Sequence, residues 1–319
     1  KRRNTMNNQW TAQDIPDLTG KVIIVTGANS GLGYESTAAF AAKGATVVMA
    51  CRNMTKAENA RQEILKRVPA ANLDVMQLDN ASLESVRAFA QAFKVKYDRL
   101  DVLLNNAGIM AIPRQLTADG FESQIGVNHL AHFALTGLLL DVLVSTPNAR
   151  IHNVSSAANY QGKIAFDDLM GEKDYSRWDA YQQSKLANVF HAFELNKRLK
   201  AAGYDTIANA SHPGGVDTNL ATATLEEGGS RLEAIMVPIL LPVIGQDISM
   251  GVLSQLYGSV GADAKGGAFY GPRWFGLKGY PAEAKANSDA YDAAALKRFW
   301  EMSEELTGVK YELLEKATA

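Results

Sequence analysis

The sequence has almost no cysteine, little excess charge and no long apolar run. Cys51 is the only cysteine in 319 residues, so no disulfide can form within the chain, and a reducing, cytoplasmic compartment is expected. A net charge of −2 does not favour a nucleic-acid partner or an anionic membrane surface. The longest uncharged apolar run, residues 235–244, is too short for a membrane span. No apolar segment follows the basic start, so no signal peptide is expected.

Metal ligation is not expected either. His129, His132 and His212 lack the spacing of a metal-binding motif, and the one cysteine has no partner nearby in the sequence. These histidines are interpreted as structural residues.

The most informative stretch joins an apolar strand, a glycine-rich turn and a helix. Residues 21–25 are β-branched and apolar, as in a buried parallel strand, and the alanine-rich residues 34–43 end at Gly44 as helices often do. Between them, glycines let backbone N–H groups approach a pyrophosphate at the positive helix end. The pattern therefore predicts a dinucleotide site, the alternative being a plain turn with incidental glycines. The predicted contacts are Gly27, Asn29, Ser30, Gly31, Leu32 and Gly33.

Strands and helices are expected to alternate along the rest of the chain. The expected strands are residues 21–25, 45–50, 73–78, 100–104, 150–154, 206–210 and 267–270, and the expected helices after the first are 53–67, 83–97, 123–143, 178–201 and 289–306. Regular alternation implies an α/β fold with a parallel sheet of about seven strands and helices on both faces. No shift in composition marks a boundary, so residues 18–319 are predicted to form one domain after an N-terminal extension, residues 1–17.

The residues after the second strand indicate which dinucleotide binds. An acidic residue about twenty positions past the glycines often holds the adenosine ribose, but this chain has Cys51, Arg52 and Asn53 there. A guanidinium suits a 2′-phosphate, which favours NADP over NAD, although Arg52 at a strand end can also simply face solvent. Asp79 is placed either to accept from an adenine amino group or to cap the next helix.

Tyr181 and Lys185 are four residues apart and fall on one face of a predicted helix. A neighbouring ammonium is expected to lower the pKa of the phenol, so that the pair can perform general acid–base chemistry. Ser155 and Ser156 follow the fifth strand, at the edge where parallel sheets bind ligands.

Taken together and in this order, these motifs resemble the short-chain dehydrogenase/reductase family, from about residue 18 to residue 270. The resemblance is carried by Thr-Gly-x-x-x-Gly-x-Gly at 26–33, Asn-Asn-Ala-Gly at 105–108, Ser156, Tyr181-x-x-x-Lys185 and Pro213-Gly214. Residues 127–133, 181–188 and 212–218 are similar to the branch that contains retinol dehydrogenases, the WW-domain oxidoreductase and light-dependent protochlorophyllide reductase. The resemblance implies one Rossmann-type doubly wound domain.

The resemblance also implies roles for individual residues. Tyr181 would exchange a proton with the substrate oxygen, Ser156 would hydrogen-bond that oxygen, and Lys185 would hold the nicotinamide ribose. Asn128 would anchor a water in a proton relay, or alternatively bridge strands, and Thr218 would contact the nicotinamide carboxamide. The remaining implied cofactor contacts are Asn80, Asn106, Ala107, Gly108, Pro213, Gly214 and Val216.

The substrate is less well indicated. Residues 219–247 form an apolar lid in this interpretation, which favours a hydrophobic carbonyl or alcohol, although the same residues could pack on the sheet, on a second subunit or on a membrane surface. A non-catalytic dinucleotide sensor or scaffold is the alternative function. Alkene reduction of the protochlorophyllide type is a further alternative. That type of enzyme has a cysteine near its active site, whereas the only cysteine of this chain, Cys51, is expected at the adenosine end, so this alternative is disfavoured. A homo-oligomer and a monomer both remain open, since the tail beyond Tyr280 can cover a surface used for association.

Overall fold

Eight strands form a single sheet in the computed structural model, which describes residues 9–216 and 246–315. Their order is β3-β2-β1-β4-β5-β6-β7-β8, and all neighbours are parallel except β7 and β8. The predicted α/β, doubly wound fold is confirmed. The strands are β1 (Val22–Thr26), β2 (Thr46–Cys51), β3 (Asn72–Gln77), β4 (Val102–Asn105), β5 (Arg150–Val154), β6 (Ile207–Ser211), β7 (Phe269–Trp274) and β8 (Lys278–Ala284).

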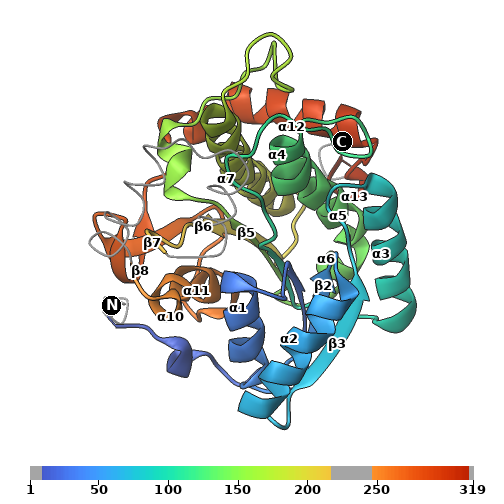
Figure 1. Ribbon diagram of the computed structural model, residues 1–319, viewed down its shortest axis with the longest axis vertical. Helices are drawn as coiled ribbons and strands as arrows, with labels where there is room; N and C mark the ends of the chain where they lie inside the picture. Colours follow the sequence, from blue (N-terminus) through green and yellow to red (C-terminus); the bar gives the residue numbers. More distant parts are fainter. Residues whose placement is uncertain (1–8, 217–245, 316–319) are drawn as a thin grey trace.

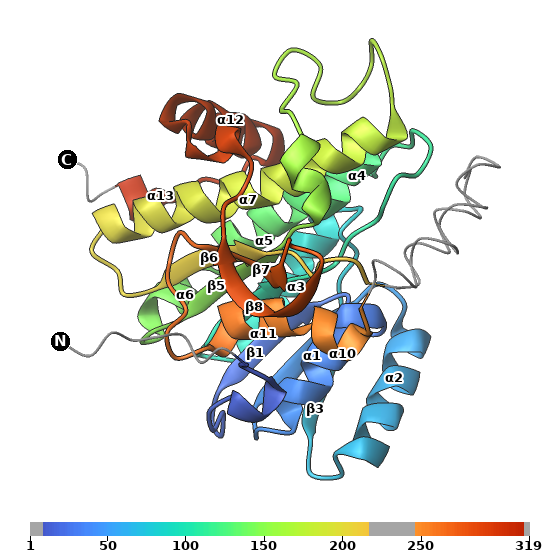
Figure 2. The ribbon, with the colours of Figure 1, turned by 90° about the vertical axis from the view of Figure 1, so that its left-hand side faces the viewer.

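Helices cover both faces of the sheet, and Figure 2 shows α5, α7 and α12 on one side and α1, α10 and α11 on the other. The helices are α1 (Gly31–Ala41), α2 (Met54–Arg67), α3 (Leu83–Lys96), α4 (Ser123–Ile125), α5 (Ala131–Leu138), α6 (Leu140–Ser145), α7 (Arg177–Ala201), α10 (Ile248–Gly251), α11 (Leu253–Val260), α12 (Ala293–Thr307) and α13 (Glu312–Glu315). The structure also has three short 3-10 helices and one π-helix. The 3-10 helices are η1 (Ala12–Asp14), η3 (Ala157–Gln161) and η4 (Ser288–Tyr291), and the π-helix is η2 (Gly126–Leu130).

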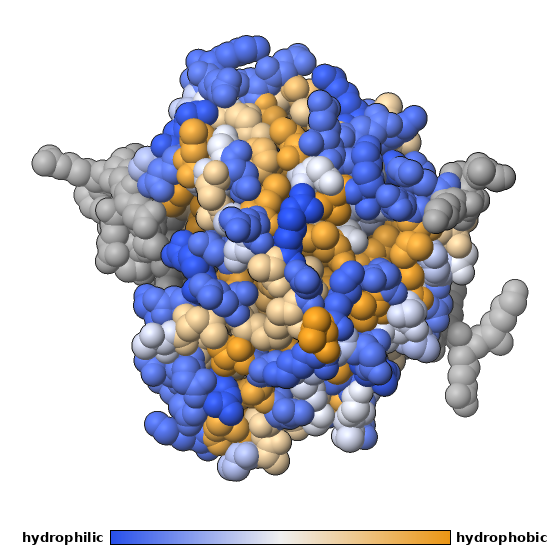
Figure 3. Space-filling view, turned by 90° about the vertical axis from the view of Figure 1, so that its right-hand side faces the viewer, coloured by the Kyte–Doolittle hydropathy of each residue, from blue (hydrophilic) through white to orange (hydrophobic). Residues whose placement is uncertain are grey.

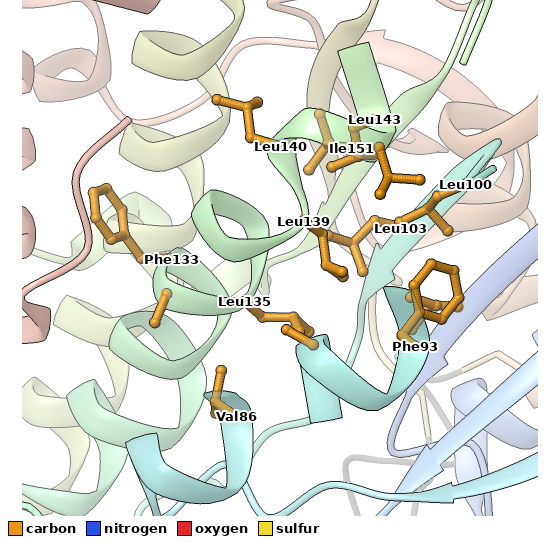
Figure 4. Packing of buried hydrophobic residues seen from close by; sticks show 14 of the residues in the cluster. Val86, Phe93, Leu100, Leu103, Phe133, Leu135, Leu139, Leu140, Leu143 and Ile151 are labelled. Carbon is orange, nitrogen blue, oxygen red and sulfur yellow. The ribbon is translucent and has the colours of Figure 1, made fainter. Parts of the chain in front are cut away.

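The two faces of the sheet divide the core in two. Val22 and Ile24 of β1 join the cluster that contains α3, α5 and α7, whereas Ile23 and Val25 join the cluster that contains α1, α2 and α11. Side chains alternate across a strand, so a continuous apolar run supplies both clusters at once. Figure 4 shows the first cluster, where Phe133 and Leu135 of α5 and Val86 and Phe93 of α3 lie around strand residues such as Leu103.

The predicted long helix at residues 123–143 is wrong in detail. The segment is divided into α4, the π-helix η2, α5 and α6. In η2 the Ala131 N–H reaches the Gly126 carbonyl, five residues back, and the Asn128 side chain bonds the backbone of Ile109. The spacing of apolar residues in the sequence does not reveal this π-helix, because the contact of Asn128 with the loop at Ile109 stabilises it.

The sheet also has one strand more than predicted. β8 pairs with β7 as an antiparallel hairpin at the sheet edge, with an irregularity between Pro272 and Trp274. Gly279 and Pro281 make β8 a poor strand by propensity, and only the pairing with β7 selects the extended conformation.

Both ends of the described chain pack against the core. In the predicted N-terminal extension, Trp10 and Ile15 are buried, and the Trp10 ring meets the Tyr257 ring edge-on at 5.4 Å. At the other end α12 buries Phe299 and Trp300 against α5 and α7. The predicted helix 289–306 is interrupted at Asp292, whose carboxylate caps α12 by accepting the N–H groups of Ala294 and Ala295.

One face of the molecule exposes hydrophobic side chains. Figure 3 shows the side that carries α3, where hydrophobic residues are visible across the middle of the face between hydrophilic ones. Val95 of α3 is 85% exposed. Within the two described ranges, no helix combines the length and the apolar character needed to cross a bilayer.

All five histidines are buried, which predicts sensitivity to acid. Burial lowers the pKa of His132, His152 and His212 to about 4 and that of His191 to about 3, and the pKa of His129 also falls well below its usual value. Between about pH 6.5 and pH 4 the unfolded chain therefore binds more protons than the folded one. The free energy of unfolding decreases as the pH is lowered through this range, by up to about 1.4 kcal/mol per pH unit for each histidine.

Urea unfolding at pH 7, 6 and 5 measures this dependence. The free energy of unfolding is expected to decrease by several kcal/mol between pH 7 and pH 5, with each buried histidine contributing up to about 1.4 kcal/mol per pH unit. A flat profile between pH 7 and pH 5 would contradict the burial of neutral imidazoles.

Candidate active site

A cavity of about 750 Å³ lies at the carboxyl ends of the strands, where the strand order reverses between β1 and β4. Of the residues predicted from the sequence, Gly33 and Asn128 lie behind its wall, and Thr218 is outside the described residues. Those that line it are Gly27, Asn29, Ser30, Gly31, Leu32, Arg52, Asp79, Asn80, Asn106, Ala107, Gly108, Ser156, Tyr181, Lys185, Pro213, Gly214 and Val216. The structure thus brings nearly all of the predicted residues to one place.

The glycine turn forms one end of the cavity. Gly27 has a φ of +66°, a conformation that favours glycine. A Cβ on Gly33 would collide with the Gly27 carbonyl oxygen and would lie 2.6 Å from Asn106 Nδ2, so Gly33 lets α1 approach the strands closely. Ser30 is the N-cap of α1 but makes no side-chain capping bond. The first N–H groups of α1 are therefore available to an anion.

The loop after β4 is held against β1 by Thr26. Its hydroxyl oxygen accepts the backbone N–H groups of Asn106 and Ala107, each at 2.9 Å, and the Asn106 side-chain amide donates to the Thr26 carbonyl at 2.8 Å. These bonds join two strands that are 80 residues apart in sequence. They place Asn106, Ala107 and Gly108 on the cavity floor.

Two cationic side chains lie at the end of the cavity next to β2. Arg52 lines it as predicted, and Lys56 in the first turn of α2 lies beside it. Sequence reasoning missed Lys56, although a lysine one turn after the strand end was a usable signal. Within the described part of the chain neither side chain forms an ion pair or hydrogen bond, so both are available to a bound anion.

Asp79 also lines the cavity while it shapes its own loop. One carboxylate oxygen accepts the Ala81 N–H at 2.9 Å, whereas α3 is capped by Ser82, whose side chain accepts the Ser85 N–H. The interpretation of Asp79 as the cap of the next helix is therefore wrong, and its contact with an adenine amino group stays a prediction.

Ser156, Tyr181 and Lys185 converge on the cavity from two elements. Ser156 follows β5, and Tyr181 and Lys185 lie one turn apart on α7, with the Lys185 Nζ 5.7 Å from the centroid of the Tyr181 ring. The Ser156 hydroxyl is close enough to the Tyr181 hydroxyl to influence its pKa, and the Ser156 oxygen accepts the Ala158 N–H at 3.2 Å. Ser155 instead donates to the Lys185 carbonyl at 2.7 Å and so secures α7.

The expected lowering of the Tyr181 pKa by Lys185 is wrong for this structure. Burial raises the pKa of Tyr181 to about 12, and the Ser156 hydroxyl opposes only part of that rise. Burial also lowers the pKa of Lys185 to about 8. Desolvation favours the neutral form of both groups and outweighs their mutual attraction. The phenol therefore keeps its proton at neutral pH, and the raised pKa makes it a weaker acid than a free tyrosine.

Asn128 lies behind the part of the cavity that Tyr181 and Lys185 line. Its Oδ1 accepts the Ile109 N–H at 2.8 Å, and its Nδ2 donates to the Ile109 carbonyl and to Ser184 Oγ, both at 2.9 Å. A Cβ on Gly108 would lie 3.0 Å from Asn128 Oδ1 and 3.2 Å from Lys185 Nζ, so the absence of a side chain there permits this packing. Asn128 bridges the loop after β4 and α7, and its relay role stays a prediction.

The apolar wall of the cavity includes a segment that the sequence analysis did not single out. Ile109, Met110, Ile112, Leu116 and Val127 line it, mostly from the loop after β4. The predicted lid, residues 219–247, lies outside the described residues except for Gln246 and Asp247. An irregular loop lacks the periodicity that marks a strand or a helix, so its contribution was not visible in the sequence.

The lone cysteine takes no part in this site. Cys51 is buried at the end of β2, and burial raises the pKa of its thiol to about 11, which disfavours the reactive thiolate. Among the residues that the structure describes, no three His, Cys, Asp or Glu side chains are grouped so that they could hold a metal ion.

Comparison with curated proteins finds retinol dehydrogenases. Human retinol dehydrogenase 12 is 48% identical over 203 residues, which are 64% of this chain and 64% of that protein. The chain thus spans a little under two thirds of the length of this relative. Mouse retinol dehydrogenase 12 is 37% identical over 299 residues, which cover 92% of this chain and 89% of the relative.

Solved structures share the fold. An uncharacterised protein from Mycobacterium paratuberculosis is 41% identical, with a TM-score of 0.78 over 95% of this chain and 99% of its own. A Shigella flexneri protein described as a short-chain dehydrogenase and solved with NADP is 26% identical, with a TM-score of 0.53 over 72% of this chain and 93% of its own. A family model for short chain dehydrogenases matches residues 21–228. With the sheet order, the glycine turn and the Ser-Tyr-Lys group in agreement, the chain belongs to the short-chain dehydrogenase family.

Proposed function

We propose that this chain is an NADP-dependent oxidoreductase that interconverts a hydrophobic carbonyl compound and its alcohol. The observation that carries the proposal is the single cavity that joins the glycine turn and Arg52 at one end to Ser156, Tyr181 and Lys185 at the other. A phosphate-binding end and an acid–base end in one cavity suit a nicotinamide dinucleotide and a reacting carbonyl.

The residues present fit such a cofactor. Backbone N–H groups at the uncapped start of α1 suit its pyrophosphate, and the close packing of Gly33 on Gly27 leaves that end free of side chains. Lys185 would hold the nicotinamide ribose, and Asp79 and Asn80 would hold the adenine end. When bound, the nicotinamide supplies or accepts the hydride.

The chemistry of the chain's own residues is proton transfer and orientation. In the direction of reduction, the Tyr181 hydroxyl, which is protonated at neutral pH, donates its proton to the oxygen of the substrate as negative charge develops there. Ser156, whose hydroxyl is close enough to that of Tyr181 to influence its pKa, orients it and the substrate oxygen. The Lys185 ammonium stabilises the phenolate that is left behind, and it carries its charge below about pH 8.

The preference for NADP is supported by the two cations at the adenosine end. Arg52 and Lys56 line the cavity without an ion pair among the described residues, and no carboxylate occupies the position after β2 that would hold a free 2′-hydroxyl. A 2′-phosphate would bind the guanidinium through two parallel hydrogen bonds and the ammonium through its charge.

Replacing Arg52 by alanine is expected to raise the KM for NADPH about tenfold to a hundredfold, while the KM for NADH stays within about threefold, because a charge-assisted bidentate contact contributes roughly 1.5–3 kcal/mol. Steady-state kinetics with both cofactors measures the ratio. Arg61→Ala serves as the control, since Arg61 lies on the same helix as Lys56 and pairs with Glu58 instead. An equal loss with NADH would contradict the proposed 2′-phosphate contact.

A substrate panel tests the proposed reaction. NADPH oxidation is measured with aldehydes and ketones of increasing chain length, and NADP reduction with the matching alcohols. The apolar wall of Ile109, Met110, Ile112 and Leu116 predicts a kcat/KM that rises with chain length. Cofactor binding without turnover across the whole panel would contradict an enzyme and favour the dinucleotide sensor.

A further inference from the structure

A buried histidine connects the loops that form the cavity floor. His132 is the second residue of α5, is 1% exposed and does not line the cavity. Its Nδ1 lies 3.0 Å from the Asn128 carbonyl oxygen, and its Nε2 lies 2.9 Å from Thr26 Oγ1 and 3.0 Å from Asn80 Nδ2. One imidazole thus touches the end of β1, the loop after β3 and the π-helix η2.

These partners determine which ring nitrogen carries the proton. A carbonyl oxygen can only accept, so Nδ1 must donate to Asn128, and Nε2 of the neutral ring is then the acceptor. The Asn80 amide and the Thr26 hydroxyl are both donors and satisfy Nε2. The Thr26 hydroxyl lies 2.9 Å from His132 Nε2 and 3.4 Å from the Leu104 carbonyl oxygen, so the nearer acceptor for its single proton is His132. The Thr26 oxygen is left to accept the N–H groups of Asn106 and Ala107.

The resulting chain of hydrogen bonds runs in one direction. It leads from the Asn106 and Ala107 N–H groups through Thr26 to His132, and from His132 to the Asn128 carbonyl. Asn80 joins at the same acceptor nitrogen and also donates to the Val127 carbonyl at 3.2 Å. Asn80, Asn106 and Ala107 line the cavity. Loss of the acceptor nitrogen of His132 would therefore loosen two loops of the cavity floor at once, the loop after β3 that carries Asn80 and the loop after β4 that carries Asn106 and Ala107.

We infer that His132 is a positioning residue, whose acceptor nitrogen holds Thr26 and Asn80 so that the cavity floor is formed before the dinucleotide binds. This inference rests on the proposed function, since it concerns the same cofactor. It assigns no contact between His132 and the cofactor. Its effect is on cofactor affinity, because a floor that must be ordered during binding weakens the complex.

Two near-isosteric substitutions separate the two ring nitrogens. In His132→Gln the side-chain amide reaches the position of Nε2 and retains an acceptor for Thr26 and Asn80. In His132→Asn the shorter amide reaches only the position of Nδ1 and retains the donor to Asn128. We expect the Kd for NADPH to rise about tenfold or more in His132→Asn and to stay within about threefold in His132→Gln, since leaving buried donors unsatisfied is costly.

His129→Leu is the matched control. His129 is equally buried, three residues earlier in the chain, but bonds Ser303 of α12 and lies away from the cavity. Its removal is expected to lower the melting temperature and to leave the Kd for NADPH unchanged. NADPH binding is followed by its fluorescence, with thermal melting of each variant and steady-state KM and kcat alongside. For His132→Asn the KM for NADPH should rise with the Kd, while kcat at saturating cofactor changes by less than about threefold.

The outcomes distinguish the inference from the proposed function. If the unsubstituted chain binds no NADPH, both are overturned. If it binds and His132→Asn binds equally well, only the inference is overturned. Equal weakening in His132→Gln and His132→Asn, in step with their melting temperatures, would indicate a merely structural role and would also overturn it. Weakening in His132→Asn with rescue in His132→Gln supports it.

Discussion

Replacing Tyr181 with phenylalanine is expected to lower kcat about a thousandfold, within the range of roughly 10²–10⁴ that a positioned acid–base group contributes. The substitution removes the phenol hydroxyl that lines the cavity together with Ser156 and Lys185 and that is protonated at neutral pH. The ring would still fill the same buried volume, so the cavity shape and the Kd for NADPH should change by less than about threefold.

Single-turnover kinetics with saturating NADPH measures this loss on the chemical step. Tyr257→Phe is the control, because Tyr257 is also buried but lies on α11, away from the cavity. Its kcat is expected to match that of the unsubstituted chain. If Tyr181→Phe kept more than about a tenth of the rate, another group would have to donate the proton.

Replacing Gly33 with alanine is expected to remove cofactor binding, with a rise in the Kd for NADPH of at least about a hundredfold. The added Cβ would collide with the Gly27 carbonyl oxygen, and Asn106 Nδ2 would lie 2.6 Å away. Both neighbours are held, the first by the backbone of the glycine turn and the second by its bond to the Thr26 carbonyl. Helix α1 would have to move away from the strands, and the N–H groups at its start would move with it.

Isothermal titration with NADPH and thermal melting separate loss of binding from loss of folding. Gly203→Ala is the matched control, because Gly203 also gains one methyl group but nothing lies within 4 Å of it. Its φ of +79° makes a loss of about 1 kcal/mol of stability expected, with no change in the Kd. If Gly33→Ala bound NADPH normally, the close packing of α1 would not be needed for the cofactor.

Much of the site was visible in the sequence because its signals are local. The strand, glycine turn and helix at residues 21–43 follow one another directly, and Tyr181 and Lys185 share a helix face by their spacing alone. The order of strands and helices likewise predicted the sheet. The retained Ser156, Tyr181 and Lys185 made an oxidoreductase the preferred hypothesis before any contact was known.

The sequence by itself determined the class of fold, and through the resemblance to a known family it predicted a phosphate-binding turn and acid–base residues, since those motifs are made of residues within about one element. Only the tertiary structure decided the π-helix at Asn128, the pairing of β8, the apolar wall after β4 and the raised pKa of Tyr181. Each of these arises from groups that are distant in the chain and meet only after folding. Hydrogen bonding and desolvation depend on those meetings, and no periodicity in the sequence records them.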